Sequence, residues 1–188
     1  ANINIPLTVG GGLKKIKDIE EALISGADKV AINTQFIEDK NFISQSSTKF
    51  GSQAIVGSIE AKFMKNDNKF IALTDNGRNV SKYDVVDWIK ILENGGVGEI
   101  ILTTVDFEGT QKGYDLKLLE IIDKIIKVPL VVSGGIGNIN HVEECVKYSS
   151  VSGIALASTL HFNQLKINEI KQKVLNTSIL NYDKKFNI

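Results

Sequence analysis

An internal repeat constrains the fold of this chain more than any other feature. Residues 5–13 read Ile-Pro-Leu-Thr-Val-Gly-Gly-Gly-Leu, and residues 128–136 read Val-Pro-Leu-Val-Val-Ser-Gly-Gly-Ile, an offset of 123 residues. After a one-residue insertion, the apolar run at 30–34 falls on the run at 154–158. Self-similarity at a fixed offset is typical of a duplicated structural unit. We therefore interpret the chain as part of a domain built from two related halves.

Short apolar runs alternate with helical patterns along the whole chain. The expected strands are 5–9, 29–33, 54–60, 99–104, 128–133 and 153–157. Apolar residues at three- and four-residue spacing predict helices at 14–25, 35–49, 83–94, 115–126 and 138–147. Residues 63–82 interrupt this rhythm, and their turn-forming Asn, Asp and Gly residues predict an inserted hairpin. A last helix is expected at 164–175, followed by a loose tail at 176–188.

The alternation predicts a parallel sheet with right-handed crossovers, which fits either an open doubly wound sheet or a closed barrel. The repeat favours one of these two architectures. One offset contains four expected strands, so a domain made of two such halves has eight strands. Eight is the strand number of the (β/α)8 TIM barrel. We therefore expect an α/β TIM barrel with strands three to eight present, as a single partial domain over 1–175, and with the first two strands preceding Ala1.

Composition excludes several classes of protein. The chain has 188 residues, with 22 Lys and Arg against 22 Asp and Glu. A nucleic-acid or membrane-surface binder would show a basic excess, so neither partner is expected. The single cysteine, Cys145, excludes an intramolecular disulfide and a thiolate-rich zinc site. No apolar run approaches the roughly 20 residues that span a bilayer, so we expect a cytoplasmic protein. We also expect neither a metal ion nor a cofactor.

Glycine-bearing strand ends predict phosphate binding. Gly10–Gly12 ends the first strand and Ser133–Gly135 ends its repeat, while Asn33-Thr34 and Ala157-Ser158 end the following pair. Glycines let backbone N–H groups approach an anion, and a helix N-terminus behind them adds positive potential. A tight turn is the alternative reading of one such cluster. Two clusters related by the duplication predict two phosphate sites on opposite sides of the barrel mouth, and hence a ligand with a phosphate at each end.

Charged residues at strand ends are the candidates for chemistry. Glu60 ends the third expected strand and is a candidate general acid or base, with an ion pair to Lys62 as the alternative. The fourth strand ends in 103–110, which offers hydroxyls and carboxylates, some of which can instead cap the loop and the next helix. Lys29 and Glu99 begin strands at the opposite end, where charges are usually solvated or paired. On physical grounds alone, these two are expected to be structural.

Several motifs, taken together, resemble one family. They are Pro6-Leu7-Thr8-Val9-Gly10-Gly11-Gly12, Gly26-Ala27-Asp28-Lys29-Val30, Ile32-Asn33-Thr34, Phe50-Gly51-Ser52-Gln53, Gly98-Glu99-Ile100, the segment Asp106 to Asp115 with Gly109-Thr110 and Gly113-Tyr114-Asp115, Ser133-Gly134-Gly135 and His161-Phe162. Over nearly the whole chain they resemble the cyclase subunit of imidazole glycerol phosphate synthase, a (β/α)8 barrel of histidine biosynthesis. The sister isomerase of that pathway shares the glycine motifs, whereas Gly113-Tyr114-Asp115 and His161-Phe162 resemble the cyclase.

This resemblance implies a lyase and cyclase that receives ammonia from a glutaminase subunit bound at the amino-terminal face of the barrel. Its substrate would be phosphoribulosyl-formimino-aminoimidazole carboxamide ribotide, which carries two phosphates, and its products imidazole glycerol phosphate and aminoimidazole carboxamide ribotide. By resemblance, one phosphate is held by Gly12, Asn33 and Thr34, and the other by Gly109, Gly135, Ala157 and Ser158. The resemblance also places Thr103, Ser133 and Glu108 in the site, and Lys29 and Glu99 at the ammonia entrance.

Two departures from the family pattern leave alternatives open. The family uses an aspartate on the first strand, which would precede Ala1, and one on the fifth strand, where this chain has Glu60. Phe107 and Glu108 stand where the family usually has Arg and Asp. These substitutions also fit cyclase-like partners of amidotransferases that modify surface sugars. A further alternative is a catalytically incomplete barrel fragment, whose unpaired strand edges would invite a complementing segment.

Overall fold

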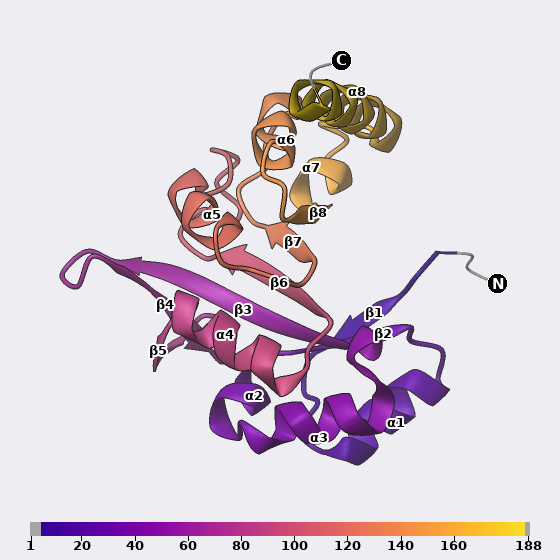
Figure 1. The fold of residues 1–188 in the computed structure, drawn as a ribbon, viewed down its shortest axis with the longest axis vertical. Helices are drawn as coiled ribbons and strands as arrows, with labels where there is room; N and C mark the ends of the chain where they lie inside the picture. Colours follow the sequence, from indigo (N-terminus) through magenta and orange to yellow (C-terminus); the bar gives the residue numbers. More distant parts are fainter. Residues whose placement is uncertain (1–4, 187–188) are drawn as a thin grey trace. The chain divides into compact units, whose positions relative to one another are not determined.

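In the computed structural model, which describes residues 5–186, the chain divides into two compact units, Ala1–Ile101 and Leu102–Ile188. Figure 1 shows strands followed by helices along each unit, apart from the consecutive strands β3, β4 and β5 of the first. The division falls inside strand β6, Glu99–Thr104. All six strands expected from the repeat are present and are separated by helices, which confirms the α/β class. Whether residues 1–175 act as one domain stays a prediction.

The first unit contains three parallel strands with helices packed against them. Strand β1, Thr8–Gly10, pairs in parallel with β2, Lys29–Ile32, and β2 pairs in parallel with β3, Ile55–Met64. Helices α1, Ile16–Ile24, α3, Asn41–Phe50, and α4, Val85–Gly95, gather on one side of these strands (Figure 1). The largest fully buried side chains of this unit include Trp88, Phe36, Ile19, Ile43, Ile55 and Ile59.

Local sequence explains where helix α4 begins and ends. The Asp84 carboxylate accepts a hydrogen bond from the Val86 amide at 2.8 Å and so caps the first turn. Gly96 ends the helix with φ of 94°, in the left-handed region. Buried residues recur at three- and four-residue spacing, so one face of the helix enters the core. These residues are Val85, Trp88, Ile89 and Leu92.

An antiparallel extension follows the third strand. Strand β3 continues to Met64, and β4, Lys69–Thr74, returns antiparallel beside it with Leu73 opposite Glu60. Strand β5, Asn79–Asp84, pairs antiparallel with β4. The chain turns through residues with positive φ, at Asn68 and at 75–77. Glu60 therefore lies where the parallel strand becomes part of the antiparallel extension.

The second unit repeats the βα pattern. Strand β7, Leu130–Ser133, pairs in parallel with β8, Val151–Ala155. Helices α5, Leu116–Asp123, and α6, Ile139–Val146, each begin at a side chain, Asp115 or Asn138, that accepts two backbone amides. The short α7, Ser158–His161, follows β8. Helix α8, Ile167–Phe186, packs against α6, with Lys173 Nζ 2.7 Å from Glu143 Oε2. The buried apolar side chains of this unit are Leu102, Tyr114, Leu118, Leu119, Ile122, Leu130, Val132, Ile136, Val142 and Cys145.

Most predicted helices match the structure to within three residues at each end, and two differ more. The helix expected at 35–49 is two helices, α2, Thr34–Glu38, and α3. The break falls at Asp39, which is extended and whose carboxylate accepts the Asn41 amide at 2.9 Å. Apolar spacing runs through the break, so periodicity does not detect it. Helix α8 continues to Phe186, past the expected end at residue 175, because apolar residues keep the three- and four-residue spacing of a helix beyond that point. Within the described residues, no helix combines the length and the apolar character needed to cross a membrane.

Candidate functional site

The duplication seen in the sequence is present in the backbone of the glycine loops. Gly11 and Gly12 follow β1 with φ of 103° and 71°. Gly134 and Gly135, 123 residues later, follow β7 with φ of 102° and 83°. Positive φ at two successive residues strongly favours glycine. Each glycine pair therefore turns the chain in the same way at the carboxyl end of a strand.

The residues before α2 and α7 also match. Asn33 has φ of −112° and ψ of −85°, and Ala157 has φ of −122° and ψ of −79°. Both lie in an uncommon backbone region and directly precede a short helix that begins at Thr34 or Ser158. The predicted correspondence of the two strand ends is thus confirmed at the level of backbone conformation.

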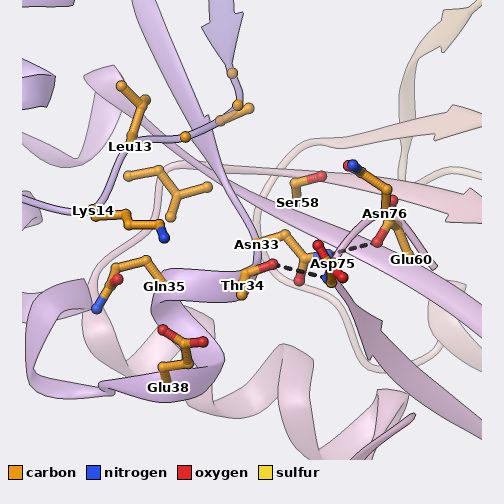
Figure 2. A pocket seen from close by; sticks show the side chains of 15 residues that line it. Leu13, Lys14, Asn33, Thr34, Gln35, Glu38, Ser58, Glu60, Asp75 and Asn76 are labelled. Atoms are coloured by element: carbon orange, nitrogen blue, oxygen red, sulfur yellow. Dashed lines mark hydrogen bonds between the residues drawn. The ribbon is translucent and has the colours of Figure 1, made fainter. Parts of the chain in front are cut away.

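A pocket of about 480 Å³ lies at the carboxyl ends of the strands of the first unit (Figure 2). It is bounded by the glycine loop after β1, the end of β2, one face of β3 and the turn between β4 and β5. Four residues predicted from the sequence line it together: Gly12, Asn33, Thr34 and Glu60. The structure therefore gathers one predicted phosphate set and the predicted acid or base around one cavity.

Glu60 accepts two hydrogen bonds in this pocket. Its Oε2 accepts from Asn33 Nδ2 at 2.9 Å and from the Gly77 amide at 2.9 Å. Asn33 Nδ2 also donates to the Leu73 carbonyl at 3.1 Å. Both partners of this amide group are oxygen acceptors, so the NH2 group, not the amide oxygen, faces Glu60. A carboxylate oriented by fixed donors at the edge of a pocket is suited to proton transfer.

The hydroxyl of Thr34 already accepts one hydrogen bond. The Asp75 amide donates to Thr34 Oγ1 at 3.1 Å, drawn as a dashed line in Figure 2. A hydroxyl that accepts one bond still carries a hydrogen that it can donate. Thr34 can therefore donate to an anion in the pocket while it holds the turn between β4 and β5.

Sequence reasoning missed part of the lining of this pocket. The side chains that line the pocket beyond the predicted set include Lys14, Gln35, Glu38, Ser58, Asp75 and Asn76. Ser58 lies two residues before Glu60 on the same strand, so the period of two would have placed it on the same face. Asp75 and Asn76 come from the inserted hairpin, and no local signal connects them with this strand end.

In the second unit, two loops that follow strands are joined. The Gly113 amide donates to the Gly135 carbonyl at 2.8 Å, which ties the loop after β6 to the glycine loop after β7. A Cβ atom at Gly135 would collide with the Gly113 carbonyl and lie 3.0 Å from Phe107 Cβ. Gly109 has φ of 73° and open space where a side chain would begin. The space around Gly135 is thus filled by neighbouring atoms, whereas the space around the equivalent Gly12 of the first unit is open.

The Gly113-Tyr114-Asp115 motif has an evident structural use. The Tyr114 hydroxyl is buried and donates to the Leu102 carbonyl at 3.1 Å. Burial, with nearby Cys145 and Asp115, raises the pKa of Tyr114 well above its ordinary value, so the phenol remains a neutral donor. Asp115 caps α5 by accepting the amides of Lys117 and Leu118. The motif therefore anchors the loop after β6 to the core of its unit.

The other predicted residues of the second unit lie in or directly after strands. Thr103 is in β6 and Ser133 is the last residue of β7. Glu108 lies in the turn after β6, and its amide donates to the Thr104 carbonyl at 3.0 Å. Ala157 and Ser158 stand at the start of α7. That these residues bind the second phosphate stays a prediction.

Lys29 and Glu99 form an ion pair at the amino ends of β2 and β6. Lys29 Nζ lies 2.6 Å from Glu99 Oε2, and the two side chains are 32% and 17% exposed. Both are the first residues of their strands, at the opposite end from the pocket. The pairing expected on physical grounds is present, and the role at an ammonia entrance stays a prediction.

Side chains with metal-binding chemistry do not cluster in the described part of the chain. Among residues 5–186, no group of three or more His, Cys, Asp or Glu is arranged to hold a metal ion. Cys145 is buried and free, and burial, with the nearby Glu144 carboxylate, raises its pKa to about 12. Its thiol is a packed core group rather than a ready nucleophile.

Comparison with known proteins gives consistent matches over almost the whole chain. Residues 1–166 match the family described as "Histidine biosynthesis protein". The "Imidazole glycerol phosphate synthase subunit HisF" of Prochlorococcus marinus (strain MIT 9211) is 40% identical over 180 residues, which are 95% of this chain and 70% of that protein. The subunit of the same name from Lactococcus lactis subsp. cremoris (strain MG1363) is 38% identical over 94% of this chain and 68% of its own length.

Proposed function

Because the chain belongs to the family of histidine biosynthesis proteins, we propose that it is a cyclase of the imidazole glycerol phosphate synthase type. In this proposal it uses ammonia to convert phosphoribulosyl-formimino-aminoimidazole carboxamide ribotide to imidazole glycerol phosphate and aminoimidazole carboxamide ribotide. The observation that carries the proposal is the pocket of the first unit, which brings Gly12, Asn33 and Thr34 together with Glu60. Phosphate-binding groups and a candidate acid or base at one strand edge are what this reaction requires.

The pocket residues divide the chemistry between binding and proton transfer. The glycine loop offers backbone N–H groups and Thr34 offers a hydroxyl to one phosphate of the substrate. When ammonia adds to a carbonyl carbon, a carbon–nitrogen bond forms, and the carbonyl π bond breaks with its electron pair moving to the oxygen. The nitrogen must then lose a proton, and the oxygen must gain protons to leave as water. The Glu60 carboxylate is oriented by Asn33 and Gly77 to accept that proton and to return it to a leaving group.

The opposite end of the strands supports the second part of the proposal. Lys29 and Glu99 form a partly buried ion pair at the amino ends of β2 and β6. In the proposed enzyme this pair lies at the entrance for ammonia, beside a glutaminase subunit docked on the amino-terminal face. The relatives are named as subunits of a synthase, which supports a partner protein. We propose a cytoplasmic enzyme that needs no cofactor.

The test replaces the Glu60 carboxylate with its amide. Glu60→Gln keeps a carbonyl oxygen that can accept from Asn33 and Gly77, so the fold should persist while proton transfer is lost. We expect ammonia-dependent formation of imidazole glycerol phosphate to fall by about 10²-fold or more, the usual contribution of general acid–base catalysis. Substrate binding, measured by calorimetry, should remain. Glu38→Gln, which removes another carboxylate lining the same pocket, is the matched control and should keep its turnover.

Unchanged turnover in Glu60→Gln would remove Glu60 from the mechanism. Absence of turnover in the unmodified chain, with substrate phosphates still bound, would contradict the proposed activity. That outcome would favour the catalytically incomplete barrel, or the cyclase-like partners in surface-sugar modification to which Glu60, Phe107 and Glu108 also point.

A further inference from the structure

The pocket of the first unit contains a cation that the roles above do not use. Lys14 follows the glycine loop by two residues, lines the pocket, and directs its side chain into it (Figure 2). We propose that Lys14 binds the phosphoryl group held by this unit, and that it makes the pocket selective for a dianionic phosphate. The inference rests on the proposed function for the class of ligand and extends it to a residue outside the motifs of the family resemblance.

The charge of the lining makes a cation necessary for such a ligand. Three carboxylates line the same pocket: Glu38, Glu60 and Asp75. At a few ångströms and moderate dielectric, each would repel a phosphate dianion strongly. Backbone N–H groups carry only partial charge, so they do not balance three carboxylates. Lys14 is the one cationic side chain among the described lining residues.

The backbone of Lys14 is fixed at the rim of the pocket. The amides of Lys14 and Lys15 both donate to Asp18 Oδ2, each at 2.8 Å. These two bonds are the main reason that the pKa of Asp18 is lowered, so the clamp is an ionised carboxylate at neutral pH. Gly12 lies two residues before Lys14, so the same clamp orders the exit of the glycine loop. The ammonium therefore starts from a defined point beside the N–H groups that would hold the phosphate.

The ammonium of Lys14 is also available. Lys17 and Lys49 of this unit form ion pairs, with Glu21 at 3.3 Å and with Glu20 at 3.2 Å. No described carboxylate lies within ion-pair distance of the Lys14 ammonium, although Glu38 lines the same pocket. A lysine ammonium has three donors and acts as a point charge on phosphate.

Of the two repeated glycine loops, only the first is followed by a lysine at this position. The residue 123 positions after Lys14 is Gly137, so the second glycine loop has no equivalent cation. Instead, the Gly137 amide donates to His141 Nδ1 at 3.1 Å. The two predicted phosphate sites are therefore chemically unequal, and binding of free phosphate should depend on Lys14 at the first site only.

The experiment titrates inorganic phosphate into the whole chain and follows the amide resonances of Gly11 and Gly12 by NMR. We expect Lys14→Ala to weaken binding at these resonances by about tenfold or more, the range for a hydrogen bond to a charged group. Lys14→Arg should retain binding. Lys15→Ala is the matched control, because it makes the same change of charge one residue away from the described pocket lining and should change affinity less than about twofold.

Binding by Lys14→Ala equal to that of the unmodified chain would overturn the proposal. An equal loss in Lys15→Ala would also overturn it, because overall charge and not contact would then set the affinity. No phosphate binding by any variant would overturn both this proposal and the first phosphate site. Lys14-dependent binding without turnover would contradict the proposed function alone, and turnover with Lys14-independent phosphate binding would contradict this inference alone.

Discussion

The two glycine loops form a matched pair for measuring what a side chain costs at equivalent positions. Gly12 and Gly135 occupy the same place in the repeat, with φ of 71° and 83°. Alanine at either position pays the same backbone penalty, about 1–2 kcal/mol for an L-residue in the left-handed region. Any further difference between Gly12→Ala and Gly135→Ala therefore comes from the space around the new methyl group.

That space differs sharply between the two loops. A Cβ at Gly12 meets no atom within 4 Å, whereas a Cβ at Gly135 collides with the Gly113 carbonyl and approaches Phe107 Cβ to 3.0 Å. Relieving the collision moves the loop that donates the Gly113–Gly135 hydrogen bond. Overpacking costs about 1–3 kcal/mol and the lost hydrogen bond about 1 kcal/mol. We expect Gly12→Ala to lower the free energy of unfolding by about 1–2 kcal/mol and Gly135→Ala by roughly 3–6 kcal/mol.

Urea unfolding followed by far-ultraviolet circular dichroism measures both losses. The single tryptophan, Trp88, is buried in the first unit, so its fluorescence reports that unit separately. Gly12→Ala should shift the fluorescence transition and Gly135→Ala mainly the dichroism transition. Equal losses for the two variants would refute the reasoning, and so would a larger loss for Gly12→Ala. If Gly135→Ala does not fold, its loss exceeds the range expected here, and Gly134→Ala, whose Cβ would lie 3.0 Å from the Thr104 carbonyl, tests the same packing.

Two further predictions concern charge and titration. A double-mutant cycle on Lys29→Met and Glu99→Gln should give a coupling of about 1 kcal/mol, because the pair is only partly exposed, and a coupling near zero in denaturant titrations would contradict the pairing. Burial raises the pKa of Cys145 from 9.0 to about 12, so the folded state holds its proton more tightly than the unfolded state. The free energy of unfolding should therefore fall as pH rises above about 9 towards 12. Iodoacetamide should label Cys145 at pH 8 only when denaturant is added, and rapid labelling of the folded chain would contradict this expectation.

The fold was predictable from the sequence where local patterns determine the backbone. The Gly-Gly pairs at 11–12 and 134–135 require positive φ, and the structure repeats that conformation after both strands. Asn33 and Ala157 occupy equivalent positions in the repeat, and their backbone dihedral angles are similar. The break at Asp39 was not predictable from spacing, since a single side chain-to-backbone hydrogen bond interrupts the helix without changing the apolar pattern.

Part of the site was not predictable, because its contacts join segments without a common local signal. Glu60 was identified from its place at a strand end, but its donor Gly77 lies 17 residues further along, in a turn whose position depends on the register of β4 against β3. The same turn reaches Thr34 through the Asp75 amide, 41 residues away. This geometry gives a physical reason for a glutamate at position 60, where the family has the shorter aspartate. Shortening it to aspartate would withdraw the carboxylate by about one carbon–carbon bond, about 1.5 Å, and the bonds to Asn33 and Gly77 could not both survive without movement of the turn. The hairpin and the glutamate are therefore matched to each other.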